Sequence, residues 1–111
     1  MDNRKDDSYY ARKAIENIEA IGRYVNGKSY DEFIADAELM DATMFRLIQM
    51  IESVKNISPR FKENHVEIPW GDIVGFRNGI VHEYGKTDYR TVYETITMDI
   101  QELKQALQEI A

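Results

Sequence analysis

The stretch FRNGIVHEYG, residues 76–85, combines side chains that could do chemistry with the apolar spacing of a helix. His82 carries an imidazole, a group that can accept and donate a proton near neutral pH. Arg77 carries a permanent positive charge, and Tyr84, seven residues later, returns to the same side of a helix. This stretch is therefore suited to proton transfer beside a fixed cation.

Arg77 occupies a position that is normally apolar. On a helix that advances by about 100° per residue, Ile73, Phe76 and Ile80 form one face, and Arg77 falls within it. Burying a guanidinium without a partner is costly. We therefore expect Arg77 to pair with an acid, to reach water, or to lie at an interface or a site.

The opposite side of this helix carries a ridge of glycines. Gly71, Gly75 and Gly79 recur every fourth residue, flanked by Asn78 and His82. Each glycine costs a helix about 1 kcal/mol relative to alanine. Such a ridge allows close approach by another helix, by a second copy of this helix, or by the backbone of a ligand.

Asn78 and His82 are four residues apart and are neighbours on one face, whereas Arg77 and His82 diverge by about 140° on a straight helix. A curled arginine or a distorted helix could bring Arg77 and His82 together within one chain. A two-fold dimer whose motif helices meet would also gather two arginines and two histidines.

A purely structural interpretation of these residues is also available. Arg77 would then pair with Glu83 or Asp72, while Tyr84 would be a core or rim aromatic. His65, in the polar stretch KENHVE, is expected to be an exposed loop residue.

The elements that must position these residues are all helical. Apolar residues recur at helical spacing almost throughout, and no stretch alternates like a strand. We predict an all-α fold: a four-helix up-down bundle with one additional short helix, in a single domain of residues 1–111 that forms a homodimer. We expect the first helix to end at Asn26-Gly27, and a capping box of Ser29 and Glu32 to open a second helix that carries the apolar positions 33–51. Ser58-Pro59 should open a short third helix. The fourth should lie between Pro69 and Gly85, and Thr87 or Asp88 should cap the fifth.

Composition restricts the class of function. The net charge is −6, which argues against general electrostatic binding of nucleic acid, although residues 55–90 carry six basic and five acidic side chains. With no cysteine, two histidines, no phosphate-binding glycine loop and no evident serine or cysteine nucleophile, we expect neither a metal nor a cofactor. The sequence has neither a secretion signal nor a membrane span, so a cytoplasmic protein is expected.

The chain has Arg77 and Asn78, then His82 after three further residues, then Tyr84 after one more. This pattern resembles the RN-x-x-x-H-x-Y motif of the HepT-like toxins, a branch of the HEPN superfamily. The run from Ile68 to Lys104 is similar to the C-terminal half of that family, and the likeness spans nearly the full chain. Tyr93 stands where the family commonly has tryptophan.

The resemblance implies a metal-independent endoribonuclease toxin that dimerises with the motif at a shared cleft. It implies a nucleotidyltransferase antitoxin of the MNT type as partner, in a toxin–antitoxin system. That partner would silence the toxin by attaching AMP to the motif tyrosine, Tyr84. Beyond the homodimer, two dimers could join into a higher assembly.

The residue chemistry fits this implication. His82 can act as the base that removes a 2′-hydroxyl proton, or as the acid from the other subunit. Arg77 can bind the phosphate and stabilise its developing charge, and Asn78 can orient His82 or contact the phosphate. The expected products carry a 2′,3′-cyclic phosphate and a 5′-hydroxyl.

Two other interpretations remain open. The acidic balance favours a non-catalytic helical module that binds the nucleotidyltransferase partner, or a nucleotide, through the same cleft. A structural dimer in which Arg77 pairs with an acid is the third.

Overall fold

The computed structural model describes the backbone of residues 5–82 and 88–111 and the side chains of residues 5–76 and 88–111. Within these ranges every regular element is a helix, which confirms the predicted all-α class. The elements are α1 (Asp7–Val25), α2 (Tyr30–Ala35), α3 (Ala37–Lys55), α4 (Pro59–Glu63), α5 (Trp70–His82), α6 (Tyr89–Glu94), the π-helical segment η2 (Thr95–Asp99) and α7 (Ile100–Gln108).

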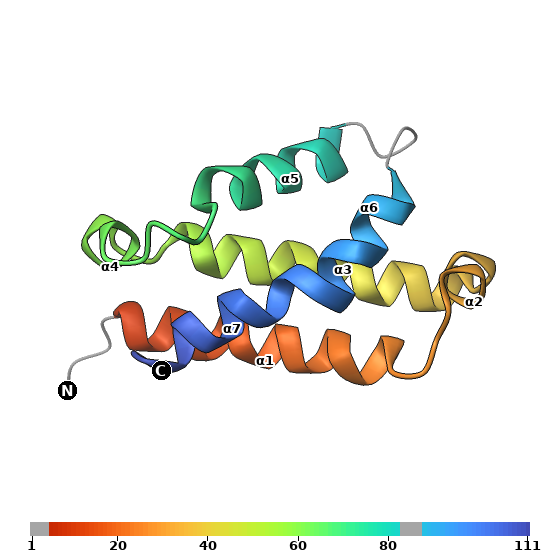
Figure 1. Cartoon of the computed structure of the whole chain (residues 1–111), viewed down its shortest axis with the longest axis horizontal. Helices are drawn as coiled ribbons and strands as arrows, with labels where there is room; N and C mark the ends of the chain where they lie inside the picture. The colour runs from red at the N-terminus through yellow and green to blue at the C-terminus, as the bar shows by residue number, and fades with distance from the viewer. Residues whose placement is uncertain (1–4, 83–87) are drawn as a thin grey trace.

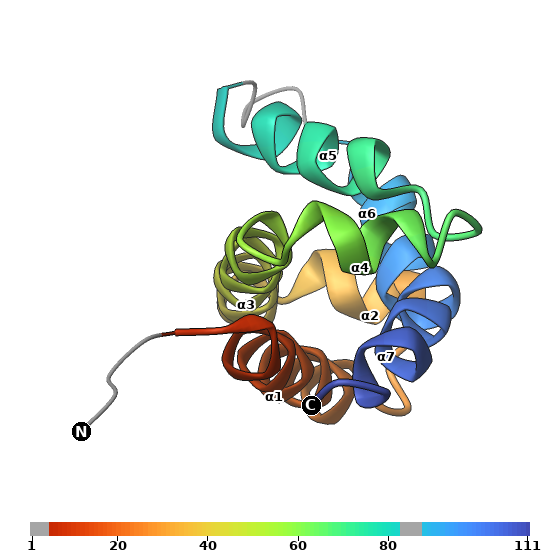
Figure 2. The same cartoon turned by 90° about the vertical axis from the view of Figure 1, so that its left-hand side faces the viewer.

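The long helices alternate in direction along the chain (Figure 1). α1 and α3 lie side by side and antiparallel, and α5 lies on the side of α3 away from α1 (Figures 1 and 2). The continuous rod α6–η2–α7 then runs back so that α7 packs against α1. None of the described helices is both long and apolar enough to cross a membrane. α5, which carries the motif, is thus an outer helix of this arrangement.

Several helix ends lie where the sequence predicts them. Gly27 has φ 75°, a left-handed conformation that suits glycine after α1. Ser29 and Glu32 form the capping box of α2, Ser58 caps α4 with Pro59 in its first turn, and Asp88 caps α6. These ends were predictable because each cap is a hydrogen bond between residues three apart or fewer. The predicted end of the fourth helix at Gly85 lies outside the described residues.

The prediction of one continuous second helix is wrong. Asp36 has extended backbone angles, and its side chain accepts a hydrogen bond from the Leu39 amide at 3.0 Å, which opens α3. This aspartate therefore divides the segment into α2 and α3 at its own position, because a carboxylate that caps a following helix cannot sit inside a preceding one.

The last helix also departs from the predicted regular form. At η2 the Ile100 amide donates to the Thr95 carbonyl, five residues back. The hydroxyls of Thr95 and Thr97 donate to the carbonyls four residues earlier, at 2.8 and 2.7 Å. Threonine hydroxyls that bind these carbonyls compete with the regular ladder and bend helices. The threonines are therefore the local feature that accompanies the wide turn.

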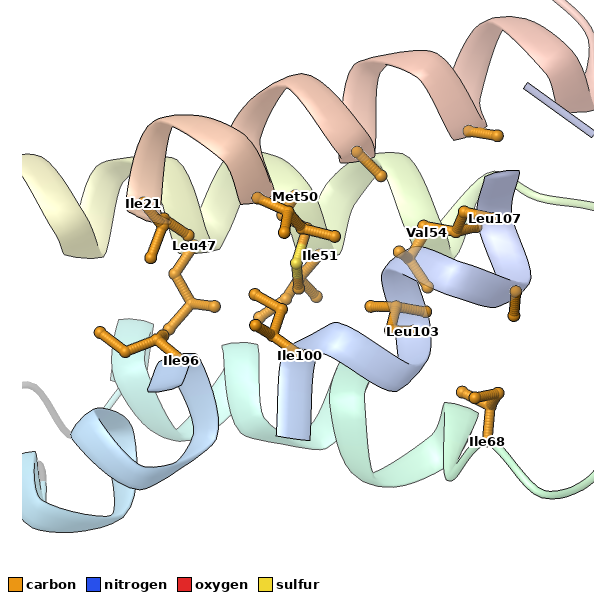
Figure 3. Packing of buried hydrophobic residues seen from close by; sticks show 14 of the residues in the cluster. Ile21, Leu47, Met50, Ile51, Val54, Ile68, Ile96, Ile100, Leu103 and Leu107 are labelled. Carbon is orange, nitrogen blue, oxygen red and sulfur yellow. The ribbon is translucent and has the colours of Figure 1, made fainter. Parts of the chain in front are cut away.

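The core lies between α1, α3 and the α6–η2–α7 rod. Ile100 and Leu103 of α7 point toward Met50, Ile51 and Val54 of α3 (Figure 3). All of these side chains are buried. Because interiors are close-packed and apolar burial is the main driving force, this cluster fixes the rod against α3.

Tyr93 ties α6 to the start of α2. Its hydroxyl donates to the Lys28 carbonyl at 2.5 Å, and its ring packs on Phe33 and Tyr30 with centroids 5.6 and 5.7 Å apart. Tyr93 therefore contributes both a hydrogen bond and ring packing at this position.

Tyr93→Phe should lower the free energy of unfolding by about 1 kcal/mol, because it removes one hydrogen bond and keeps the ring contacts. Urea unfolding followed by circular dichroism measures the change. Tyr93→Leu, which also removes the ring contacts, should cost clearly more. Equal stability of Tyr93→Phe and the wild type would mean that the hydroxyl contributes nothing.

Candidate active site

α5 carries three of the four predicted site residues. The helix extends from Trp70 to His82, so Arg77, Asn78 and His82 all lie on it. The side chains of these three residues lie outside the described part of the chain, as does all of Tyr84. What the structure does describe is the helix that positions the motif and everything that holds this helix in place.

Ile73 and Phe76 anchor α5 to the core. Both side chains are half-buried and pack against the buried cluster, with α3 as the neighbouring helix. On a helix, position 77 lies only about 40° around the axis from position 73. By this helix geometry, position 77 falls toward the core side of α5.

Trp70 fixes the beginning of α5. Its indole N–H donates to the carbonyls of Lys62 and His65, at 3.2 and 3.0 Å. Its ring also meets the Phe61 ring edge-on, with centroids 6.0 Å apart. The last carbonyls of a helix lack partners within that helix. The Lys62 and His65 carbonyls also accept from the backbone amides of His65 and Ile68, so Trp70 adds a further donor that ties the first residue of α5 to the segment before it.

His65 is not the exposed loop residue that the sequence predicts. Only 17% of its side chain is accessible, and its ring packs edge-on against Phe61 at 4.4 Å. Nδ1 lies 3.3 Å from the Glu67 carboxylate and Nε2 lies 3.0 Å from Glu109. A hydrogen bond from its own backbone N–H lowers the pKa of Glu67, burial opposes this less strongly, and the contact with His65 lowers the pKa further.

This histidine therefore has a structural role, joining the loop before α5 to the C-terminal end of the chain. Sequence reasoning missed it because Glu109 is 44 positions further along the chain. The one available signal was the aromatic pair Phe61 and Trp70 on either side of His65, which offers a surface for the ring to pack on.

The described glycines of the ridge face outward. Gly71 and Gly75 are exposed, and a Cβ built on either would meet no atom within 4 Å. Among the described residues, therefore, no helix makes the close approach that these two glycines permit. By helix geometry positions 78 and 82 continue the same outward side of the backbone.

α6 flanks the other end of the motif segment. The Asp88 side chain accepts hydrogen bonds from the Thr91 hydroxyl and from the Thr91 and Arg90 amides, at 2.8, 3.2 and 3.1 Å. These bonds, led by that of the Thr91 side chain, lower the pKa of Asp88. The Arg90 guanidinium lies over the Tyr30 ring at 4.2 Å, so this described cation is engaged by α2.

Among the described residues, no group of three or more His, Asp and Glu side chains is arranged to hold a metal ion. The carboxylate-bound His65 is the single histidine whose side chain the structure describes.

Comparison with known proteins identifies the family of this chain. Residues 14–110 match the family described as Ribonuclease HepT-like. The chain belongs to the HepT-like ribonuclease family. The match includes the whole of α5 and the rod that follows it.

Individual relatives cover most of the chain. A candidate RNase from Caldanaerobacter subterraneus subsp. tengcongensis is 35% identical over 91% of this chain and 90% of its own length. A candidate ribonuclease HepT from Thermococcus cleftensis is 32% identical over 86% of each chain. One Methanocaldococcus jannaschii protein, whose name combines gamma-glutamylcyclotransferase with candidate RNase, is 31% identical over 96% of this chain and 48% of its own length. No solved structure matches the chain at a significant level.

In this HepT-like chain, Trp70→Phe should lower the free energy of unfolding by about 1–2 kcal/mol, because the hydrogen bonds that tie Trp70 to the Lys62 and His65 carbonyls are lost. Circular dichroism is the suitable probe, since Trp70 is the single tryptophan. In hydrogen exchange the amides at the start of α5 should lose more protection than those of α1. A uniform loss across both helices would contradict a specific role for Trp70 in positioning α5.

Proposed function

We propose that this chain is a metal-independent endoribonuclease that works as a homodimer and serves as the toxin of a toxin–antitoxin system. The carrying observation is the family match over residues 14–110, which includes an outer helix bearing Arg77, Asn78 and His82. The relatives named as candidate ribonucleases support RNA as the substrate.

In the proposed reaction His82 takes the proton from a ribose 2′-hydroxyl. The 2′-oxygen then bonds to phosphorus while the bond from phosphorus to the 5′-oxygen breaks, and an acid protonates the departing oxygen. His82 of the second subunit can supply that proton, which leaves a 2′,3′-cyclic phosphate and a 5′-hydroxyl. Arg77 stabilises the added negative charge on the phosphate, and Asn78 orients His82 or binds the phosphate.

The overall charge of −6 gives RNA little general attraction to this protein. We therefore expect weak, salt-sensitive binding in which the shape of the cleft selects unpaired nucleotides. The substrate therefore has to approach where the motif arginines supply local positive charge.

His82→Ala and Arg77→Ala should each reduce cleavage of single-stranded RNA in EDTA by about 100-fold or more, the usual contribution of acid–base or charge stabilisation. Product ends are identified by direct labelling of the 5′-hydroxyl with a kinase, without prior phosphatase treatment. His65→Ala is the matched control, because the chain has only two histidines and His65 is bound by two carboxylates.

Circular dichroism at the assay temperature checks that all three variants are folded. Wild-type cleavage by both motif variants, or loss of cleavage in the His65 control with its fold retained, would refute the assignment of the catalytic residues.

The exposed glycines of α5 provide a separate test of the dimer. Gly75→Ala should stabilise an isolated chain by up to about 1 kcal/mol, because alanine favours helices and its Cβ meets open space. If two α5 helices meet at this ridge, the same methyl group lies between them and weakens the dimer. Analytical ultracentrifugation should then show a dissociation constant at least about tenfold higher, which corresponds to about 1.4 kcal/mol.

Gly22→Ala is the matched control for this test. Gly22 also lies in a helix, α1, is exposed, and has no atom within 4 Å of a built Cβ. It should raise the stability in the same way and leave the dimer unchanged. An unchanged dimer in Gly75→Ala, combined with weaker RNA binding, would assign the ridge to the RNA backbone instead.

For the partner we propose a nucleotidyltransferase antitoxin that attaches AMP to Tyr84. Each AMP adds a negative phosphate and bulk close to Arg77 in sequence, which would repel and block RNA. Two dimers joined in one assembly would present several such tyrosines to the partner.

The acidic composition supports a second candidate function, a non-catalytic module that binds such a partner or a nucleotide. Tight binding to the partner by a wild-type chain that leaves RNA intact would favour this function over the ribonuclease.

A further inference from the structure

A cleft of about 490 Å³ separates one side of α5 from η2 and α7. Its floor is apolar and is formed largely by residues that also belong to the core. From α3 it includes Met50, from α5 Ile73 and Phe76, and from α7 Ile100 and Leu103. The volume is within the usual range for small-molecule sites, which are concave and mostly apolar.

The cleft exists because α5 packs on α3 but not closely on the rod opposite. Ile73 and Phe76 remain half-buried, whereas Ile100 and Leu103 across the cleft are almost fully covered. Apolar walls without facing atoms lose dispersion contacts. The uncovered parts of Ile73 and Phe76 therefore favour an occupant with an apolar body.

The rim of the cleft is acidic. Glu67, Asp72, Asp99 and Glu102 all line it, all four are exposed, and they come from the loop before α5, from α5 itself, from η2 and from α7. Within the described residues no lysine, arginine or histidine lines the cleft. Carboxylates converging from several elements repel phosphates and attract cations.

The wide turn of the last helix forms part of this wall. Thr95 and Asp99, the first and last residues of η2, both line the cleft. Single π-turns within helices occur often at functional sites. Here the turn contributes Thr95 and the Asp99 carboxylate to the wall of the cleft.

These features also argue against two other occupants. RNA carries the wrong charge for four carboxylates. A second copy of this chain has a net charge of −6 and would bring further acids to an acidic rim.

We propose that this cleft binds a small organic cation with an apolar body. The body packs on Met50, Ile73 and Phe76. The ammonium or guanidinium head lies between Asp72 and Asp99 at the rim. This site is separate from the proposed ribonuclease function and does not depend on it.

The test uses 4-phenylbutylammonium as the probe and 4-phenylbutyrate, of similar size and opposite charge, as its control. Protein labelled with ¹³C in the methionine methyl groups reports the location of binding by NMR. Met50 lines the cleft, whereas Met40, on the same helix, does not. The ammonium should shift the Met50 signal saturably and leave Met40 unchanged, and phenylbutyrate should bind roughly tenfold or more weakly.

Two sets of variants separate charge from shape. Asp72→Asn combined with Asp99→Asn should remove most of the preference for the ammonium, whereas Glu38→Gln, an exposed acid of α3 outside the cleft, should preserve it. Ile73→Trp, which fills the cleft, should abolish binding while the helical circular dichroism is retained.

Equal binding of the two probes to the wild type would overturn the proposal, and so would saturation without a shift of Met50. A Met50 signal that moves with protein concentration in the absence of any probe would also overturn it, because a second copy would then occupy the cleft. These measurements need no RNA, so a failure here leaves the ribonuclease proposal untouched, and the reverse also holds.

Discussion

The indole N–H of Trp70, shared between the Lys62 and His65 carbonyls, determines where the motif helix begins. One turn later Ile73 packs on the core, and Phe76 does so again after another. A helix whose first residue and inner side are both fixed has its direction fixed as well. The placement of α5, the outer helix that carries Arg77, Asn78 and His82, therefore depends on contacts made before the motif starts (Figure 2).

Packing on one side only gives α5 two surfaces of opposite character. Gly71 and Gly75 leave its outward side bare, so another backbone can come close. The side toward η2 and α7 borders an apolar cleft whose rim includes Asp72 and Asp99. Because like charges repel, an anionic polymer is disfavoured at the acidic rim. The net charge of −6 does not reveal this local arrangement of charge.

Sequence reasoning succeeded where the deciding interaction is local. The structure confirms Ser29 and Ser58 as caps, together with Asp88, one of the two predicted candidates with Thr87, and each binds an amide at most three residues away. Asp36 acts in the same way but lies inside a long apolar pattern, which predicts one helix where the structure has α2 and α3. A partial signal for η2 was also present, because Val92, Ile96 and Ile100 follow one another at intervals of four, which drift around a regular helix. All three are nevertheless buried on one side, and the wide turn absorbs that drift.

By itself the sequence determined the helical class, most helix ends and the motif that places this chain in the HepT-like family, because periodicity, caps and motifs are properties of neighbouring residues. Only the tertiary structure decided that His65 is held between Glu67 and Glu109, that the glycines of α5 face outward, and that a cleft lies beside Phe76. These features depend on how segments distant along the chain pack together. Such packing follows from the sum of many weak apolar contacts, and no short stretch of sequence contains that sum.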